Sequence, residues 1–197
     1  LMVDGVGFGD YTAIVALGVT GKGYKIILGL RIGSTENSQV CRDLLTNLID
    51  RGLGYEDGLL AVIDDSKALR KALKEVFGEK VLIQRCQVHK MRNILDYLPR
   101  YKRDWVKRKL SQAWTAETAT DATRQLYSLA TSFQMQYPDA AASLREGLEE
   151  TVTLLKLNIP GLLRRSLRST NAIESAFSMM AKNVRNVKNW KNGTMVQ

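Results

Sequence analysis

Apolar runs of β type, separated by turn residues, open the chain and predict three consecutive strands. These runs cover Leu1–Phe8, Tyr11–Val19 and Tyr24–Ile32, with short connections at Gly7–Asp10 and Thr20–Gly23. Short connections of this kind join antiparallel neighbours. The pattern therefore predicts a meander at the start of the fold.

Helical and strand patterns then alternate. The predicted elements are a helix over 38–51 that stops at Gly52, a strand over Leu59–Ile63, a helix over Lys67–Phe77, a strand over Val81–Ile83 and a basic helical segment over 88–98. The strand over Leu59–Ile63 is apolar throughout, as is typical of a parallel strand that is buried on both faces.

Beyond Pro99 the chain reads as helical. Tyr101–Gly147 carries apolar residues at helical spacing, with Trp105, Val106, Leu110 and Trp114 predicted on one face. A weak strand signal occurs at Thr151–Leu154, and helical patterns follow from Pro160 and over 172–187. A meander followed by strand–helix crossovers predicts an α/β fold with a five-stranded mixed sheet and flanking helices.

Composition narrows the class of protein. The 197 residues are 45% hydrophobic and 25% charged, which is ordinary globular composition. No run approaches the roughly 18 apolar residues of a membrane span, and no signal peptide opens the chain. Cys41 and Cys86 lie far apart and indicate reduced thiols in a cytoplasm. Because the sequence starts within a strand and stops after Gly193–Thr194 without a helix cap, we expect a fragment of a longer protein.

Charge is distributed unevenly along the chain. The net charge is +9, yet residues 1–79 carry 9 Lys and Arg against 11 Asp and Glu, whereas residues 80–197 carry 20 against 9. This asymmetry indicates that the second half binds a polyanion. The alternative is a generally basic surface without a specific partner.

One carboxylate, Asp4, lies within the first apolar strand. An unpaired buried carboxylate is costly, so Asp4 either faces water on an edge strand or holds a cation. Asp64 follows the strand Leu59–Ile63, at the carboxyl end where α/β sheets place active groups. Its alternative role, shared with Asp65 and Ser66, is to cap the next helix.

Glu174 is the third candidate acid. It is the only acid after Glu150, within a strongly basic stretch, as expected for a metal ligand beside a phosphate backbone. Asn171 and Glu174 also fit the spacing of a capping box, which leaves a structural role open.

The segment Cys86–His89 contains the only histidine of the chain. Too few thiols are present for a structural zinc site. The alternative interpretation of His89 is an ordinary residue at the start of a helix. The basic run over 100–109 is either a solvated face or a grip on nucleic acid, with Trp105 and Trp114 as candidates for base stacking. A core position remains the alternative for both tryptophans.

Together these motifs resemble the Mutator-type family of bacterial insertion-sequence transposases. The most specific parts are the stretches over 85–93 (RCQVHKMRN) and 170–175 (TNAIES). The resemblance implies a ribonuclease-H-like core in two parts, 1–97 and 161–197, with an all-α insertion at 98–160 before the last catalytic helix. It implies a DDE triad at Asp4, Asp64 and Glu174, with Cys86, His89 and Asn171 as accessory residues of the active site.

The implied activity is metal-dependent cleavage at the ends of an insertion element and strand transfer into target DNA. Two Mg²⁺ or Mn²⁺ ions are the expected cofactors, and we expect a homo-oligomer on DNA, without membrane attachment, in the bacterial cytoplasm at the nucleoid. The candidate DNA-binding residues are Arg85, Lys90, Arg92, Lys102, Arg103, Lys107, Arg108, Arg168, Lys182 and Arg185.

One residue departs from the family pattern. Asp65 follows Asp64 where the family commonly has a small residue, and the extra carboxylate would compete for the metal or raise the pKa of its neighbour. Two alternative functions therefore stay open: a related nuclease without joining activity, and a catalytically inactive DNA-binding derivative.

Overall fold

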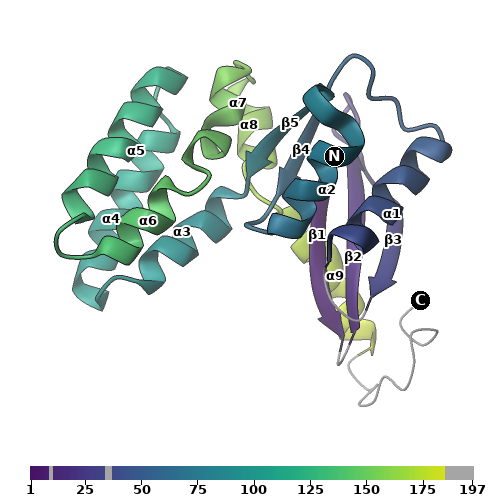
Figure 1. Cartoon of the computed structure of the whole chain (residues 1–197), viewed down its shortest axis with the longest axis horizontal. Coiled ribbons are helices and arrows are strands. Elements are labelled where there is room, and N and C mark those ends of the chain that lie inside the picture. The colour runs from purple at the N-terminus through teal and green to yellow at the C-terminus, as the bar shows by residue number, and fades with distance from the viewer. Residues whose placement is uncertain (9–10, 34–36, 185–197) are drawn as a thin grey trace. The chain divides into compact units, whose positions relative to one another are not determined.

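The computed structural model describes residues 1–8, 11–33 and 37–184. Its strands are β1 (Met2–Phe8), β2 (Tyr11–Val19), β3 (Lys25–Gly33), β4 (Leu59–Ile63) and β5 (Val81–Arg85). They form one sheet in the order β3-β2-β1-β4-β5 (Figure 1). β1 pairs antiparallel with β2 and parallel with β4, and β2 pairs antiparallel with β3. The sheet is therefore mixed, as the sequence predicts.

Helices account for most of the remaining chain. The α-helices are α1 (Ser38–Asp50), α2 (Lys67–Phe77), α3 (Gln87–Asp96), α4 (Arg100–Trp114), α5 (Ala119–Phe133), α6 (Pro138–Arg145), α7 (Thr153–Lys156), α8 (Gly161–Leu167) and α9 (Asn171–Val184), and the 3₁₀ helices are η1 (Gly78–Lys80) and η2 (Leu148–Val152). This α/β arrangement, with helices flanking a five-stranded mixed sheet, is consistent with the ribonuclease-H-like fold.

The weak strand signal at Thr151–Leu154 is wrong, because η2 and α7 occupy that segment. The carbonyl of Thr151 accepts hydrogen bonds from the side-chain amides of Gln84 and Gln87, at 3.0 and 2.9 Å. β-branched residues favour strands only weakly. Here side chains distant in the sequence satisfy the backbone instead of a neighbouring strand.

The chain divides into two compact units. The sheet unit comprises Leu1–Ile83 and the residues from Thr170 onward, and the helical unit comprises Gln84–Ser169. Helices α3 to α8 belong to the helical unit, and the insertion bounds of 98–160 stay a prediction.

Helices α1 and α2 cover one face of the sheet. The core beneath them contains Leu44, Leu45, Leu69 and Leu73 from the helices and Val3, Ile14, Ala16, Ala61 and Ile63 from the strands. Helix α9 packs against β1 and lies on the opposite face (Figure 1). The apolar alternation of β1 and β2 thus places every second side chain on the side of α9.

The helical unit has a core of its own. It is built from apolar side chains of α3 to α6, η2 and α7, including Ile94, Val106, Leu110, Leu126 and Phe133. Among the residues that the structure describes, no helix combines the length and apolar character needed to cross a bilayer.

Candidate active site

Strand register brings Asp4 and Asp64 to matching positions. Met2 of β1 lies opposite Val62 of the parallel strand β4. Asp4 and Asp64 lie two residues further along the same two segments. Side chains two residues apart along a strand share a face. The intervening Val3 and Ile63 belong to the core under α1 and α2. Asp4 and Asp64 therefore belong to the opposite face, where α9 packs.

Asp4 is buried in the middle of the sheet, with 6% of its surface exposed. Its neighbours on this face include Met2 and its cross-strand partner Val15, both buried. One carboxylate oxygen accepts a hydrogen bond from the backbone N–H of Gly5 at 3.0 Å. The alternative of a half-exposed Asp on an edge strand is wrong, because β1 is the central strand.

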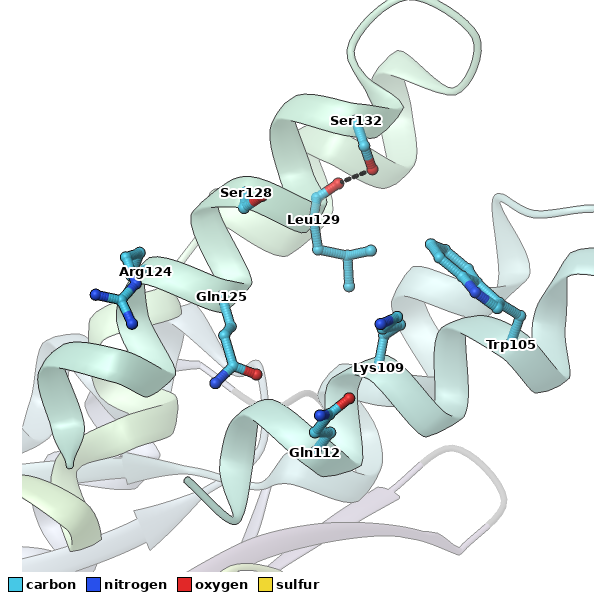
Figure 2. A pocket seen from close by; sticks show the side chains of 8 residues that line it. All are labelled: Trp105, Lys109, Gln112, Arg124, Gln125, Ser128, Leu129 and Ser132. Carbon is cyan, nitrogen blue, oxygen red and sulfur yellow. Dashed lines mark hydrogen bonds between the residues drawn. The ribbon is translucent and has the colours of Figure 1, made fainter. Parts of the chain in front are cut away.

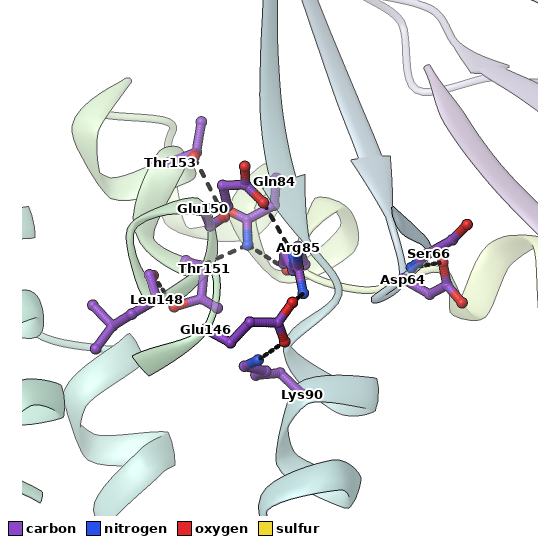
Figure 3. A network of polar contacts seen from close by, with 10 residues as sticks. All are labelled: Asp64, Ser66, Gln84, Arg85, Lys90, Glu146, Leu148, Glu150, Thr151 and Thr153. Carbon is purple, nitrogen blue, oxygen red and sulfur yellow. Dashed lines mark hydrogen bonds and ion pairs between the residues drawn. The ribbon is translucent and has the colours of Figure 1, made fainter. Parts of the chain in front are cut away.

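Asp64 is half-buried at the end of β4, and its Oδ1 accepts a hydrogen bond from the backbone N–H of Ser66 at 2.9 Å (Figure 3). The cap of α2 is Ser66, whose Oγ accepts a hydrogen bond from the N–H of Leu69 at 3.1 Å. The capping role considered for Asp64 therefore falls to Ser66, in keeping with the preference for Ser at this position.

Glu174 lies in the first turn of α9 and is half-buried. The fully buried Thr170 precedes the helix; its carbonyl accepts hydrogen bonds from the N–H groups of Ile173 and Glu174, at 2.8 and 3.2 Å. Its hydroxyl donates to Oε1 of Glu174 at 3.4 Å. A carboxylate at this end of a helix is also favoured by the helix dipole. The capping-box alternative is wrong, because Asn171 is already helical and exposed.

The three acids all belong to the sheet unit: Asp4 lies on β1, Asp64 follows β4 directly and Glu174 lies on α9. Within residues 1–8, 11–33 and 37–184, no group of three or more His, Cys, Asp and Glu side chains is arranged so that it could hold a metal ion. Like charges disfavour each other at short range. The hydroxyl of Thr170 also engages Glu174 near its own helix.

The accessory candidates are divided between the units. Cys86 and His89 belong to the helical unit, at the cap position and in the first turn of α3. Cys86 is a buried cysteine outside any disulfide, and His89 is half-buried. Asn171 belongs to the sheet unit. A catalytic role for any of the three stays a prediction.

Arg85 and Lys90, expected to contact DNA, are buried in the helical unit with 2% and 0% of their surfaces exposed. Nε of Arg85 lies 3.1 Å from Glu150, and its Nη1 lies 3.4 Å from Glu146. Nζ of Lys90 lies 3.3 Å from the second oxygen of Glu146 (Figure 3). A phosphate backbone has no access to cations at this depth, so their assignment to a DNA surface is corrected. Sequence reasoning missed the acids at 146, 149 and 150, whose concentration within the basic half was the signal from which partners could have been inferred.

The remaining basic candidates differ in exposure. Arg92, Arg108 and Arg168 are exposed. Lys102 and Arg103 are half-buried and contact their own unit: Lys102 lies 4.6 Å from the ring centroid of Tyr137, and Arg103 donates to the carbonyl of Leu98. Three further candidates are Lys107, Lys182 and Arg185. Lys107 is exposed and pairs with Asp104 at 3.3 Å; the side chain of Lys182 and all of Arg185 lie outside the described residues.

The two tryptophans of α4 have opposite environments. Trp114 is buried, and its indole N–H donates to the hydroxyl of Thr151 at 3.0 Å. It is therefore a core residue, and its candidacy for base stacking is wrong. Trp105 is 43% exposed, so the predicted apolar face of α4 includes Val106, Leu110 and Trp114 but not Trp105.

Trp105 borders a pocket of about 460 Å³ that sequence reasoning missed (Figure 2). Its lining residues come from α4 and α5: Trp105, Lys109, Gln112, Arg124, Gln125, Ser128, Leu129 and Ser132. The spacing of Trp105, Lys109 and Gln112 along α4 is that of one helix face. That spacing is the sequence signal from which one wall of the pocket was predictable.

Comparison with known proteins identifies relatives along most of the chain. A sequence model of the family described as "Transposase, Mutator family" matches residues 6–196. The transposase for insertion sequence element IST2 of Acidithiobacillus ferrooxidans is 32% identical over 176 residues, which cover 89% of this chain and 58% of that protein. The transposase for ISRM5 of Rhizobium meliloti (strain 1021) is 32% identical over 162 residues, covering 82% of this chain and 39% of the relative.

A third relative, the transposase for ISRM3 of Rhizobium meliloti (strain 1021), is 33% identical over 172 residues, covering 87% of this chain and 42% of that protein. The chain thus spans about half the length of the curated relatives it matches.

Proposed function

This chain belongs to the Mutator family of transposases, and from that premise we propose that it carries the catalytic carboxylates of a DNA transposase. The proposed reaction has two steps. Water first cleaves a phosphodiester at the end of an insertion element and frees a 3′-hydroxyl. That hydroxyl then attacks a phosphodiester of the target DNA. The P–O bond broken in the target is replaced by a P–O bond to the end of the element.

One observation supports this proposal more than any other. The parallel register of β1 and β4 sets Asp4 and Asp64 level on the face of the sheet that α9 covers, and α9 carries Glu174. Negatively charged side chains on one face of a sheet do not stabilise one another. We infer that these acids serve to hold a cation, because carboxylate oxygens are the ligands that divalent metal ions prefer.

The donor set fits a hard divalent cation, because Mg²⁺ and Mn²⁺ prefer carboxylate oxygens. Two such ions, when bound, supply an activated nucleophile and neutralise charge on the attacking and leaving oxygens. Asp4, Asp64 and Glu174 are the residues that would hold them.

The helical unit supplies positive charge for the DNA. It contains 15 Lys and Arg against 8 Asp and Glu, and the sequence of α4 alone contains six of these cations against one acid. Arg92, Arg108 and Arg168 are the exposed members of the predicted set. We expect these cations to contact phosphates on DNA, with the protein acting as a homo-oligomer at the nucleoid.

Calorimetry with Mn²⁺ and two DNA assays test the proposal. The wild-type chain is compared with Asp4→Asn, Asp64→Asn and Glu174→Gln, and with the control variants Asp57→Asn and Glu79→Gln, whose parent residues are exposed in the same unit. The DNA assays measure nicking of a supercoiled plasmid and joining of a labelled 3′-hydroxyl duplex to that plasmid. Each triad variant is expected to lose nicking, joining and Mn²⁺ binding, whereas the controls keep all three.

The other outcomes each decide between alternatives. Joining that persists in a triad variant removes that residue from the triad. Nicking without joining in the wild-type chain identifies a nuclease. DNA binding without Mn²⁺ binding identifies a catalytically inactive derivative, and Asp65→Gly then tests whether the additional acid is the cause.

A further inference from the structure

We propose that the pocket between α4 and α5 binds one unpaired nucleotide of a DNA strand, with its base against Trp105 and its phosphate at Lys109. The inference rests on the proposed function in one respect, that DNA is the ligand of this chain. It assigns a task to a part of the helical unit that is separate from the carboxylates of the sheet unit.

The pocket has the volume and the lining expected of a site for a small ligand. Its volume of about 460 Å³ falls within the roughly 300–1,000 Å³ that is usual for such sites. Both walls belong to the helical unit, and Figure 2 shows side chains of α4 and α5 lining the space between the two helices. Leu129, with 8% of its surface exposed, supplies an apolar patch.

Trp105 gives the pocket an aromatic surface. Its 43% exposure contrasts with the 5% of Trp114 on the same helix, so the core does not require it. Nζ of Lys109 lies 5.9 Å from the centroid of the Trp105 ring, within the range of a cation–π contact. An indole face beside an ammonium group matches a nucleotide, which presents a π-face next to an anionic phosphate.

The remaining polar groups favour the same ligand. None of the eight lining residues is acidic, which favours an anion. Arg124 already pairs with Asp121, so Lys109 is the better placed cation for a phosphate. Gln112 and Gln125 each offer an amide donor and acceptor, the pattern that base edges require.

The position on α4 indicates an unpaired nucleotide of a strand rather than a free one. Arg108 is exposed on the same helix, next to Lys109 in sequence. Its charge favours a continuing phosphate backbone beside the pocket. A base within a duplex is stacked on both sides, so only an unpaired base is free to stack on the indole.

Fluorescence anisotropy tests this inference in EDTA, which removes any dependence on the proposed cation site. The chain is titrated into a labelled single-stranded 12-mer and, separately, into the blunt duplex. Trp105→Ala is compared with Tyr127→Ala, whose parent residue is equally exposed at 43% on α5 but does not line the pocket. Lys109→Gln is compared with Lys156→Gln, whose parent residue pairs with Glu149 outside the pocket.

Trp105→Ala is expected to weaken single-strand binding about tenfold and to leave duplex binding unchanged. Trp105→Phe restores most of the affinity, a rescue that a loss of folding would not show. Lys109→Gln is expected to lower the salt-dependence slope for the single strand by about 0.7. The two control variants bind like the wild-type chain.

If Trp105→Ala and Tyr127→Ala bind the single strand with equal affinity, the inference is overturned. Duplex binding by both variants would leave the proposed function standing. A chain that binds neither form of DNA overturns both. Competition by free dAMP distinguishes the ligand source: displacement at concentrations near those of the 12-mer would show a free-nucleotide site and overturn the assignment to a strand.

Discussion

The sheet unit and the helical unit both bury ionisable side chains, but they combine the charges in opposite ways. The helical unit buries Arg85 and Lys90 against Glu146 and Glu150, so each cation lies beside an acid. In the sheet unit the candidate acids Asp4, Asp64 and Glu174 accept hydrogen bonds from neutral groups: the N–H of Gly5, the N–H of Ser66 and the hydroxyl of Thr170.

This difference separates structural charge from charge that is available for chemistry. Opposite charges in contact hold one arrangement of the chain, and removing one partner leaves the other buried and uncompensated. The acids of the sheet unit are proposed to hold a divalent cation instead, because carboxylate oxygens are the ligands that such ions prefer. Four predictions test this comparison, in order of decreasing expected effect.

Removing the acids of the helical unit should produce the largest loss of stability. We expect the double variant Glu146→Gln, Glu150→Gln to lower the free energy of unfolding by about 3 kcal/mol. This value is at the lower end of the range for a broken buried ion pair, because Glu146 is half exposed. Urea denaturation measures the loss. The control is Glu149→Gln, whose pair with Lys156 is exposed on both sides and is worth about 0–1 kcal/mol. Equal losses in the two variants would contradict a structural role for the buried pairs.

The acids of the sheet unit should become coupled only when Mn²⁺ is present. Saturating Mn²⁺ at 100 times its dissociation constant is expected to stabilise the wild-type chain by about 2.7 kcal/mol. In EDTA, the stability changes of Asp4→Asn and Glu174→Gln should add within about 0.5 kcal/mol, whereas in Mn²⁺ they should be non-additive by more than about 1 kcal/mol. Thermal unfolding of both single variants and the double variant measures the coupling. Additivity in Mn²⁺ would mean that the two acids do not share a cation site.

A substitution at Gly147 measures how closely the chain packs around the buried guanidinium of Arg85. It has φ +61°, and a Cβ placed there would lie 2.8 Å from Cζ of Arg85. Gly78 has a similar φ of +55° with nothing within 4 Å of such a Cβ. Both Ala variants incur the backbone strain, so the difference between them isolates the clash. We expect Gly147→Ala to cost about 1–3 kcal/mol more than Gly78→Ala by urea denaturation; equal costs would show that Arg85 moves aside freely.

Exposed cations of the helical unit should affect DNA binding without affecting stability. Arg108→Gln is expected to lower the slope of log affinity against log salt for duplex DNA by about 0.9, the value for one phosphate contact. The control is Lys22→Gln, an exposed residue of the sheet unit. Anisotropy titrations at several salt concentrations give both slopes. An unchanged slope for Arg108→Gln would remove this residue from the DNA surface.

The elements and their order were largely predictable from the sequence. The strand β4 and the helix α2 have the predicted bounds, because a short continuous apolar run and a period-3.6 apolar pattern both depend on neighbouring residues alone. Asp4 and Asp64 were identifiable as candidates because each follows from a local pattern, a carboxylate within or at the end of an apolar strand. Their alignment was not predictable, since it depends on the register between β1 and β4.

Local pattern failed where the environment of a side chain depends on distant residues. Arg85 and Lys90 resembled the exposed cations around them, but their acidic partners lie 56 to 65 residues away in the sequence. Trp105 and Trp114 share a helix, and the packing of the helical unit alone makes one exposed and the other buried.

The sequence by itself determined the α/β class, the order of the elements, the surplus of positive charge in the second half and the family. Each of these depends on residue types along the chain, which spacing and composition record directly. Only the tertiary structure decided which charges are paired, which tryptophan lines a pocket and which face of the sheet carries the acids. Burial and pairing are properties of contacts between segments far apart in the sequence, and no single segment specifies them.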